Sequence, residues 1–176
     1  MLGASVAVIR DGKVLLAKGY GLANVEPKTP ASAETVYEIA SLTKQFTATA
    51  VMLLIEEGKV SLDAPAAKYQ PDIPEKWRAV TVRQLLNQTS GIKNYTALPA
   101  LAADKEYTPK EIIEAVAAEP LEFTPGSAWR YSNTNYFLLG LLIEKVSGAS
   151  YGEFLKKEFS NRSACATAVS TTVRRI

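Results

Sequence analysis

A serine and a lysine stand three positions apart at the start of a strongly apolar segment. Ser41 and Lys44 lie within EIASLTKQF, residues 38–46. On a helix, residues i and i+3 share a face, and the unpaired N–H groups of the first turn favour a negative serine oxygen. Lys44 could accept the serine proton or stabilise a neighbouring anion. The pair therefore suits acyl transfer, and the alternative is a capping serine beside a solvated lysine.

The Ser-x-x-Lys pattern occurs twice, as SLTK from Ser41 and as SGIK from Ser90. By itself the pattern favours the capping alternative. Ser41 precedes a long apolar helix that can hold a nucleophile rigidly. Ser90 precedes Gly91 at the expected end of a helix, where we expect a reacting group to be mobile. Ser41 is therefore the candidate nucleophile.

Tyr131 and Asn133 form a second candidate group, in the turn YSN. A tyrosine could act as a general base only if its pKa of about 10 fell by roughly 3 units, or about 4 kcal/mol. The ammonium of Lys44 is the expected source of that shift. Asn133 could orient the lysine or bind a substrate amide. The alternative is a tyrosine that packs its ring and leaves its hydroxyl in solvent.

The composition excludes several kinds of site. The chain has 176 residues and no histidine, which removes Ser-His-Asp and Cys-His mechanisms and most zinc sites. Cys165 is the single cysteine, so neither an internal disulfide nor a cysteine metal cage can form. The 20 basic and 18 acidic residues are dispersed, which disfavours nucleic acid as a partner. We expect chemistry by Ser, Lys, Tyr or carboxylates, without metal or cofactor.

The apolar segments predict core elements and no membrane span. The longest, residues 46–55, is about half the ~20 residues that a spanning helix needs. The N-terminal residues alternate like a strand and lack the features of a signal peptide. We therefore expect a cytoplasmic chain or one whose leader has been removed.

The sequence predicts a β-hairpin followed by a mostly helical region. Residues 4–10 and 13–20 are β-rich and flank Asp11-Gly12, a strong hairpin signal. Residues 21–40 predict a loop with at most one short strand or turn. Periodicity and capping signals predict a buried central helix at 41–57 and further helices at 81–91, 109–118, 134–147 and 150–158.

Three motifs together resemble one protein family. SLTK, LLNQTSGI and PGSAWRYSNTNYFLLGLLIEKVSGASYGEFL occur in an order and spacing similar to those of the penicillin-recognising serine hydrolases. This group contains class C β-lactamases, D-Ala-D-Ala peptidases and related esterases. The resemblance covers about residues 3–159. It implies an α+β, β-lactamase/transpeptidase-like fold, of which the chain holds the N-terminal half.

The resemblance also implies roles for individual residues. Ser41 is the acylated nucleophile, Lys44 its proton-handling partner, Tyr131 the base of a Tyr-x-Asn motif, and Asn133 the contact to substrate and lysine. The division of base duty between Lys44 and Tyr131 stays open. The backbone N–H of Ser41 would supply half of the oxyanion hole. Gln88 replaces the usual histidine of a His-Thr-Ser-Gly stretch, which we expect to be structural.

Other parts of the family pattern are missing. No Lys/His-Ser/Thr-Gly motif follows Tyr131, and the later strands and the helix before the first strand are absent. We therefore expect a truncated fold, divided into residues 1–38 (hairpin and loop), 39–159 (helical domain) and 160–176 (atypical tail). Permitted codons for the stretch from Phe159 can be read in a shifted frame as Leu-Glu-Pro-Leu-Gly-Met-Arg-Asp, similar to the family. The tail is hypothesised to be out of frame, and sequencing the coding DNA tests this.

Two functions follow from these observations. The first is a serine hydrolase that forms an acyl-enzyme on Ser41 with a β-lactam, an ester or a D-amino-acid peptide. The second is a catalytically incompetent fragment that binds ligand without turnover. The unpaired hairpin edge predicts a homodimer, strand exchange or poor solubility. The resemblance suggests a periplasmic or secreted location.

Overall fold

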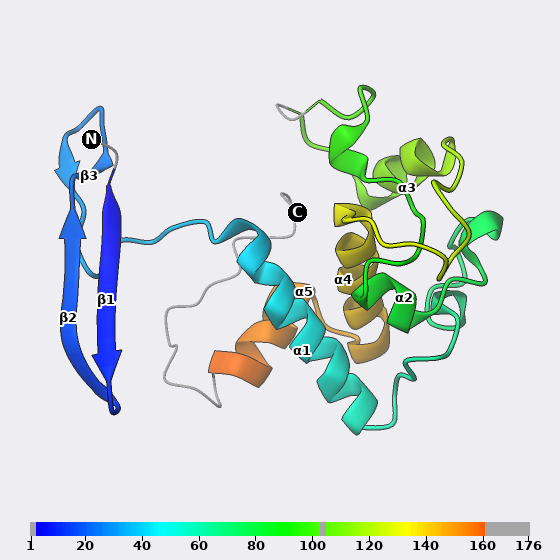
Figure 1. The fold of residues 1–176 in the computed structure, drawn as a ribbon, viewed down its shortest axis with the longest axis horizontal. Helices are drawn as coiled ribbons and strands as arrows, with labels where there is room; N and C mark the ends of the chain where they lie inside the picture. The colour runs from blue at the N-terminus through cyan, green and yellow to red at the C-terminus, as the bar shows by residue number, and fades with distance from the viewer. Residues whose placement is uncertain (1–2, 103–104, 161–176) are drawn as a thin grey trace. The chain divides into compact units, whose positions relative to one another are not determined.

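The computed structural model describes residues 3–102 and 105–160. The hypothesised out-of-frame tail beyond Ser160, with Cys165, lies outside these residues. The chain forms two compact units, and their boundary in the sequence lies between Ala40 and Ser41. The first unit is built of strands and the second of helices (Figure 1). The fold class is α+β, as predicted.

The first unit is built around the predicted hairpin. Strands β1 (Ala4–Arg10) and β2 (Lys13–Tyr20) pair in antiparallel orientation. Asp11 and Gly12 connect them with φ angles of 50° and 73°. Positive φ at both central residues gives a tight turn whose twist matches that of the strands. The register shifts after Val8, where a β-bulge interrupts the pairing.

A second small sheet completes this unit. Strands β3 (Leu22–Asn24) and β4 (Thr29–Pro30) pair in antiparallel orientation within the segment predicted to be mostly loop. The Ser5 hydroxyl donates to the carbonyl oxygen of Ser32 at 2.6 Å and is hydrogen-bonded to the Tyr37 hydroxyl at 2.9 Å. These contacts attach the connecting segment to strand β1.

The second unit is organised around helix α4. In Figure 1, α4 lies against α1, α2 and α5, in agreement with the contacts between these elements. The α-helices are α1 (Thr43–Glu56), α2 (Val82–Leu86), α3 (Pro109–Ala117), α4 (Asn133–Ser147) and α5 (Tyr151–Leu155). The remaining helical segments are the 3₁₀ turns η1 (Ala40–Leu42), η2 (Ala66–Lys68), η3 (Glu75–Trp77) and η4 (Tyr95–Ala97), and the π-helical η5 (Lys156–Ser160).

Burial differs between the two long apolar helices. The middle of α4 is enclosed, and its fully buried side chains include Leu138, Leu139 and Leu142. Helix α1 buries one face only, because Leu42 before its first turn is 62% exposed and Met52 is 48% exposed. The prediction of a buried central helix at 41–57 is therefore wrong for one face of α1. Apolar composition alone did not show which faces have neighbours.

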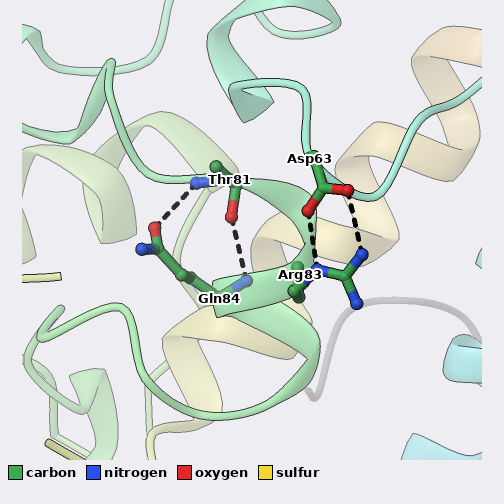
Figure 2. A network of polar contacts seen from close by, with 4 residues as sticks. All are labelled: Asp63, Thr81, Arg83 and Gln84. Carbon is green, nitrogen blue, oxygen red and sulfur yellow. Dashed lines mark hydrogen bonds and ion pairs between the residues drawn. The ribbon is translucent and has the colours of Figure 1, made fainter. Parts of the chain in front are cut away.

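Helix α2 starts at a well-defined position. Thr81 and Gln84 form a capping box: the Thr81 hydroxyl accepts from the Gln84 N–H at 3.2 Å, and the Gln84 Oε1 accepts from the Thr81 N–H at 3.0 Å (Figure 2). Arg83 donates two hydrogen bonds to Asp63, at 2.6 and 2.9 Å (Figure 2). These contacts satisfy the first N–H groups of the helix and link it to the preceding segment.

Helix α2 ends earlier than predicted. Its last residue is Leu86, whereas the sequence pattern placed the end at Gly91. Gln88 has a φ angle of 63° and Gly91 one of 74°, and both angles are incompatible with a right-handed helix. Residues 88–91 instead form a turn and an irregular segment whose carbonyl groups accept hydrogen bonds from backbone N–H groups of the 122–130 segment. The NQTSG stretch is therefore a connecting segment without regular secondary structure.

Candidate active site

Four side chains named from the sequence lie together in the helical unit. A hydrogen bond of 2.7 Å joins the Ser41 Oγ and the Tyr131 hydroxyl. The Lys44 Nζ donates to the Ser41 Oγ at 3.3 Å and to the Asn133 Oδ1 at 2.7 Å. Two segments about ninety residues apart in the chain thus form one connected polar group.

The start of α1 places Ser41 and Lys44. Ser41 lies in the turn η1, and Lys44 lies in the first turn of α1. Leu42 occupies the N-cap position, and no side chain caps this helix. The Ser41 hydroxyl is therefore not a helix cap and is hydrogen-bonded to Tyr131 and Lys44 instead. Ala40, directly before it, has a φ of 45°, a conformation that residues with a Cβ rarely adopt.

The start of α4 places Asn133, with help from a segment that the sequence analysis did not identify. The Asn133 N–H donates to the Asn94 Oδ1 at 3.1 Å, and its Nδ2 donates to the Thr96 Oγ1 at 3.3 Å. This arrangement turns the Asn133 Oδ1 toward the ammonium of Lys44. Asn94 and Thr96 come from η4 and the residue before it, and no local pattern in KNYT distinguishes them from other polar residues.

Tyr131 has an electrostatic environment suited to proton transfer. Burial raises the pKa of its phenol, but interactions with Lys44 and Ser41 and the Lys44 charge outweigh burial, so its pKa lies below the usual value of 10. The Lys44 Nζ lies 4.8 Å from the centre of the Tyr131 ring. For Tyr95 and Tyr136, burial first and the negative charge of Tyr131 second raise the pKa. Tyr131 is also 40% exposed and can meet a substrate.

The second Ser-x-x-Lys pair has a different environment. Ser90 is fully buried, where the sequence analysis expected a mobile residue. Its hydroxyl donates to the Asn135 Oδ1 at 2.6 Å and accepts from the Ile92 N–H at 3.0 Å. The expectation of mobility is wrong because the segment after α2 packs against the start of α4. Lys93 is bound to Glu119 at 2.7 Å, so SGIK is not positioned to attack a substrate.

The described residues contain neither a cluster of metal-binding side chains nor a membrane-spanning helix. In residues 3–102 and 105–160, no group of three or more His, Cys, Asp or Glu side chains could hold a metal ion. None of the helices in these ranges is long and apolar enough to cross a membrane.

Comparison with known proteins identifies relatives over most of the chain. A family model described as Beta-lactamase matches residues 1–162. The protein flp of Staphylococcus aureus is 38% identical over 157 residues, which cover 87% of this chain and 32% of flp. The chain thus spans about a third of the length of this curated relative.

Solved structures agree with the sequence comparison. The octameric penicillin-binding protein homologue from Pyrococcus abyssi is 41% identical with a TM-score of 0.75, over 90% of this chain and 38% of that chain. The D-amino acid amidase from Ochrobactrum anthropi is 33% identical with a TM-score of 0.77, over 90% and 44%. These values show the β-lactamase/transpeptidase-like fold expected from the sequence, over about two fifths of the length of those two structures.

Proposed function

The chain belongs to the β-lactamase family, and on this premise we propose that it is a serine hydrolase that forms an acyl-enzyme on Ser41. One observation carries the proposal. The Ser41 hydroxyl is hydrogen-bonded to Tyr131 and accepts a hydrogen bond from Lys44, at 2.7 and 3.3 Å. Acyl transfer by a serine requires a nearby base and a third group that orients that base. Ser41, Tyr131 and Lys44 have this arrangement.

The proposed reaction uses Tyr131 as the base. The Ser41 hydroxyl gives its proton to the Tyr131 phenolate while its oxygen attacks the substrate carbonyl carbon. Tyr131 then gives this proton to the leaving nitrogen or oxygen as the acyl bond breaks. In the second half, a water molecule loses a proton to Tyr131 and attacks the ester, and the proton returns to the Ser41 oxygen. The backbone N–H of Ser41 stabilises the oxyanion in both halves.

Lys44 and Asn133 support this reaction in the proposal. The ammonium of Lys44 stabilises the phenolate, because opposite charges at short distance favour the ionised form. The 2.7 Å bond to the Asn133 Oδ1 keeps Lys44 between the serine and the tyrosine. Asn133 retains a second amide hydrogen for a substrate carbonyl. In the alternative mechanism Lys44 is the base. Tyr131→Phe distinguishes the two, because it would leave acylation largely intact only if Lys44 were the base.

The proposed substrates are β-lactams, small esters and D-amino-acid peptides or amides. All of them present a carbonyl carbon that the serine oxygen can attack, so that the serine becomes acylated. This reaction needs no metal or cofactor. The name of the D-amino acid amidase that resembles this chain adds D-amino acid amides to the compounds worth testing.

Intact mass spectrometry after incubation tests the proposal. The protein is mixed separately with a fluorescent penicillin, a nitrophenyl ester and D-phenylalanine amide, and adduct mass and product release are followed. We expect an adduct that Ser41→Ala abolishes and that Ser61→Ala, a change at an exposed serine, does not affect. An unchanged adduct in Ser41→Ala would refute the assignment of the nucleophile.

A second candidate function is ligand binding without turnover. In the family that the chain resembles, a Lys/His-Ser/Thr-Gly motif supplies the second oxyanion N–H, and residues 132–176 of the given sequence contain no such motif. An adduct that forms and is not released supports this candidate. Saturable binding with no adduct also supports it.

A further inference from the structure

Gln88 contacts the backbone on both sides of Tyr131. Its main-chain oxygen accepts a hydrogen bond from the Arg130 N–H at 3.0 Å. Its side-chain Oε1 accepts one from the Ser132 N–H at 2.9 Å. A single residue of the segment after α2 therefore binds the backbone N–H groups of both neighbours of Tyr131, Arg130 and Ser132.

The backbone of Gln88 adopts an unusual conformation. Its φ angle is 63°, in the left-handed region that disfavours residues with a Cβ, and its side chain is buried. Such a conformation is energetically unfavourable and persists where the surroundings enforce it. Gln88 is held by its N–H, which donates to the Leu85 carbonyl, and by the Thr89 carbonyl, which accepts from the Gly126 N–H. The conformation lets the main chain and the side chain of Gln88 face the same segment.

A buried polar chain fixes the side chain of Gln88. The Asn135 Nδ2 donates to the Gln88 Oε1 at 2.6 Å, and the Ser90 Oγ donates to the Asn135 Oδ1 at 2.6 Å. The Ile92 N–H in turn donates to the Ser90 Oγ at 3.0 Å. The Oε1 thus accepts two hydrogen bonds, which matches the two lone pairs of an amide oxygen. None of these side chains is charged, so the hydrogen bonds between them persist across the pH range in which Tyr131 titrates.

The exposure of Tyr131 makes this backbone contact important. Its side chain is 40% exposed, so packing alone does not hold the ring. The position of its hydroxyl, 2.7 Å from the Ser41 Oγ, therefore depends on the position of the 130–132 backbone. We propose that Gln88 is a positioning residue that holds the Tyr131 hydroxyl against Ser41 and Lys44. The proposal rests on the proposed function, in which Tyr131 is the base.

The ionisation of Tyr131 reports this positioning without any turnover. Lys44 on α1 is the charged group that lowers the Tyr131 pKa, while Tyr95 on η4 and Tyr136 on α4 are the neighbouring titratable groups. If Tyr131 moves away from Lys44, the pKa of its phenol returns toward about 10. A role of Gln88 in stability alone would not move this pKa.

The experiment follows the ¹³Cζ resonances of labelled tyrosines as a function of pH. The Tyr131 signal is the one that Tyr131→Phe removes. Gln88→Met keeps the length of the side chain and loses the acceptor, so we expect the Tyr131 titration to move upward toward about 10. Gln88→His is the conservative variant, because a neutral imidazole keeps one acceptor for the Ser132 N–H. We expect it to retain most of the parent value. Val116→Ala, in the buried face of α3, lowers stability and should leave the titration unchanged.

Each outcome decides the proposal. A folded Gln88→Met protein with the parent Tyr131 titration overturns it, as does a parent Tyr131 that titrates like an ordinary tyrosine. If Gln88→Met does not fold, Ser90→Ala is measured instead. This variant removes the hydrogen bond to Asn135, which in turn donates to Gln88. An upward shift there supports the proposal, and no shift contradicts it. Failure of the proposed function shows separately, as the absence of an adduct on Ser41, and leaves the titration readable.

Discussion

Tyr131 and Lys44 define the chemistry expected at the scale of single residues. In a chain without histidine, a base that works near neutral pH needs a shifted pKa. The pKa of Tyr131 is lowered, so the phenolate forms at a pH below the usual value of about 10. In the proposed reaction the phenolate is the base, so the acylation rate should rise with pH and level off above the Tyr131 pKa.

Lys44→Met tests the origin of this pH dependence. The variant removes the charge that offsets burial, so the pKa of Tyr131 should rise and the ascending part of the rate profile should move to higher pH. The measurement is the acylation rate with an activated ester across neutral and alkaline pH, with Lys110→Met on the exposed face of α3 as the control. An identical profile in Tyr131→Phe would rule out Tyr131 as the base, and an identical profile in Lys44→Met would rule out Lys44 as the source of the lowered pKa.

Two buried serines provide a matched comparison of hydrogen-bond energies. Ser90 and Ser132 are at most 1% exposed. The Ser90 hydroxyl has two partners, whereas the Ser132 hydroxyl has none among the described residues. Ser90→Ala should therefore lower the free energy of unfolding by about 1–3 kcal/mol, and Ser132→Ala should leave it unchanged or raise it. Urea unfolding of both variants measures this, and equal losses would contradict the hydrogen-bond assignment.

At the scale of elements, the segment after α2 binds the backbone on both sides of Tyr131. Gly91 has a φ of 74°, and a Cβ at this position would lie 2.2 Å from the carbonyl oxygen of Phe123. Gly58 has a similar φ of 71° but open space around it. Gly91→Ala should therefore be less stable than Gly58→Ala by about 1–3 kcal/mol, since the clash with backbone adds to the conformational cost. Thermal unfolding of the two variants gives the difference, and equal stabilities would show that the 88–91 segment can move away.

The sequence predicted those elements whose signals are local. The hairpin around Asp11-Gly12 and the helix ending before Gly148 were correct, because turn and capping residues stand next to the elements that they terminate. The predicted end of α2 and the mobility expected at Ser90 were wrong, because residues 88–91 bind the distant 122–130 segment and the start of α4. Tertiary contacts of this kind leave no local pattern in the sequence.

The candidate site was predictable to a similar extent. Ser41, Lys44, Tyr131 and Asn133 were selected from motifs, and the structure brings them within hydrogen-bond distance of one another. Their catalytic roles remain predictions. The supporting contacts of Asn94, Thr96 and Gln88 were not predictable, because each of them joins segments about forty residues apart.

At the scale of the whole molecule, the hairpin predicts association between copies. Strands β1 and β2 form a two-stranded sheet within the described residues, and neither has a third strand beside it there. Val8 and Leu16 face each other across the pair and are 44% and 36% exposed, next to other exposed apolar residues. An isolated two-stranded sheet is marginally stable, and unpaired edges with apolar faces favour pairing with another chain. A homodimer or strand exchange is the expected result.

A charged pair in place of Val8 and Leu16 tests this prediction. Val8→Lys with Leu16→Glu removes apolar surface while opposite charges across the strands keep the hairpin pairing. Light scattering at increasing protein concentration should show association of the parent chain and a shift toward monomer in the double variant. The control, Val8→Ile with Leu16→Val, keeps the apolar face and should associate like the parent. The predicted association depends on the exposed hairpin. A parent chain that stays monomeric at every concentration would therefore refute the prediction.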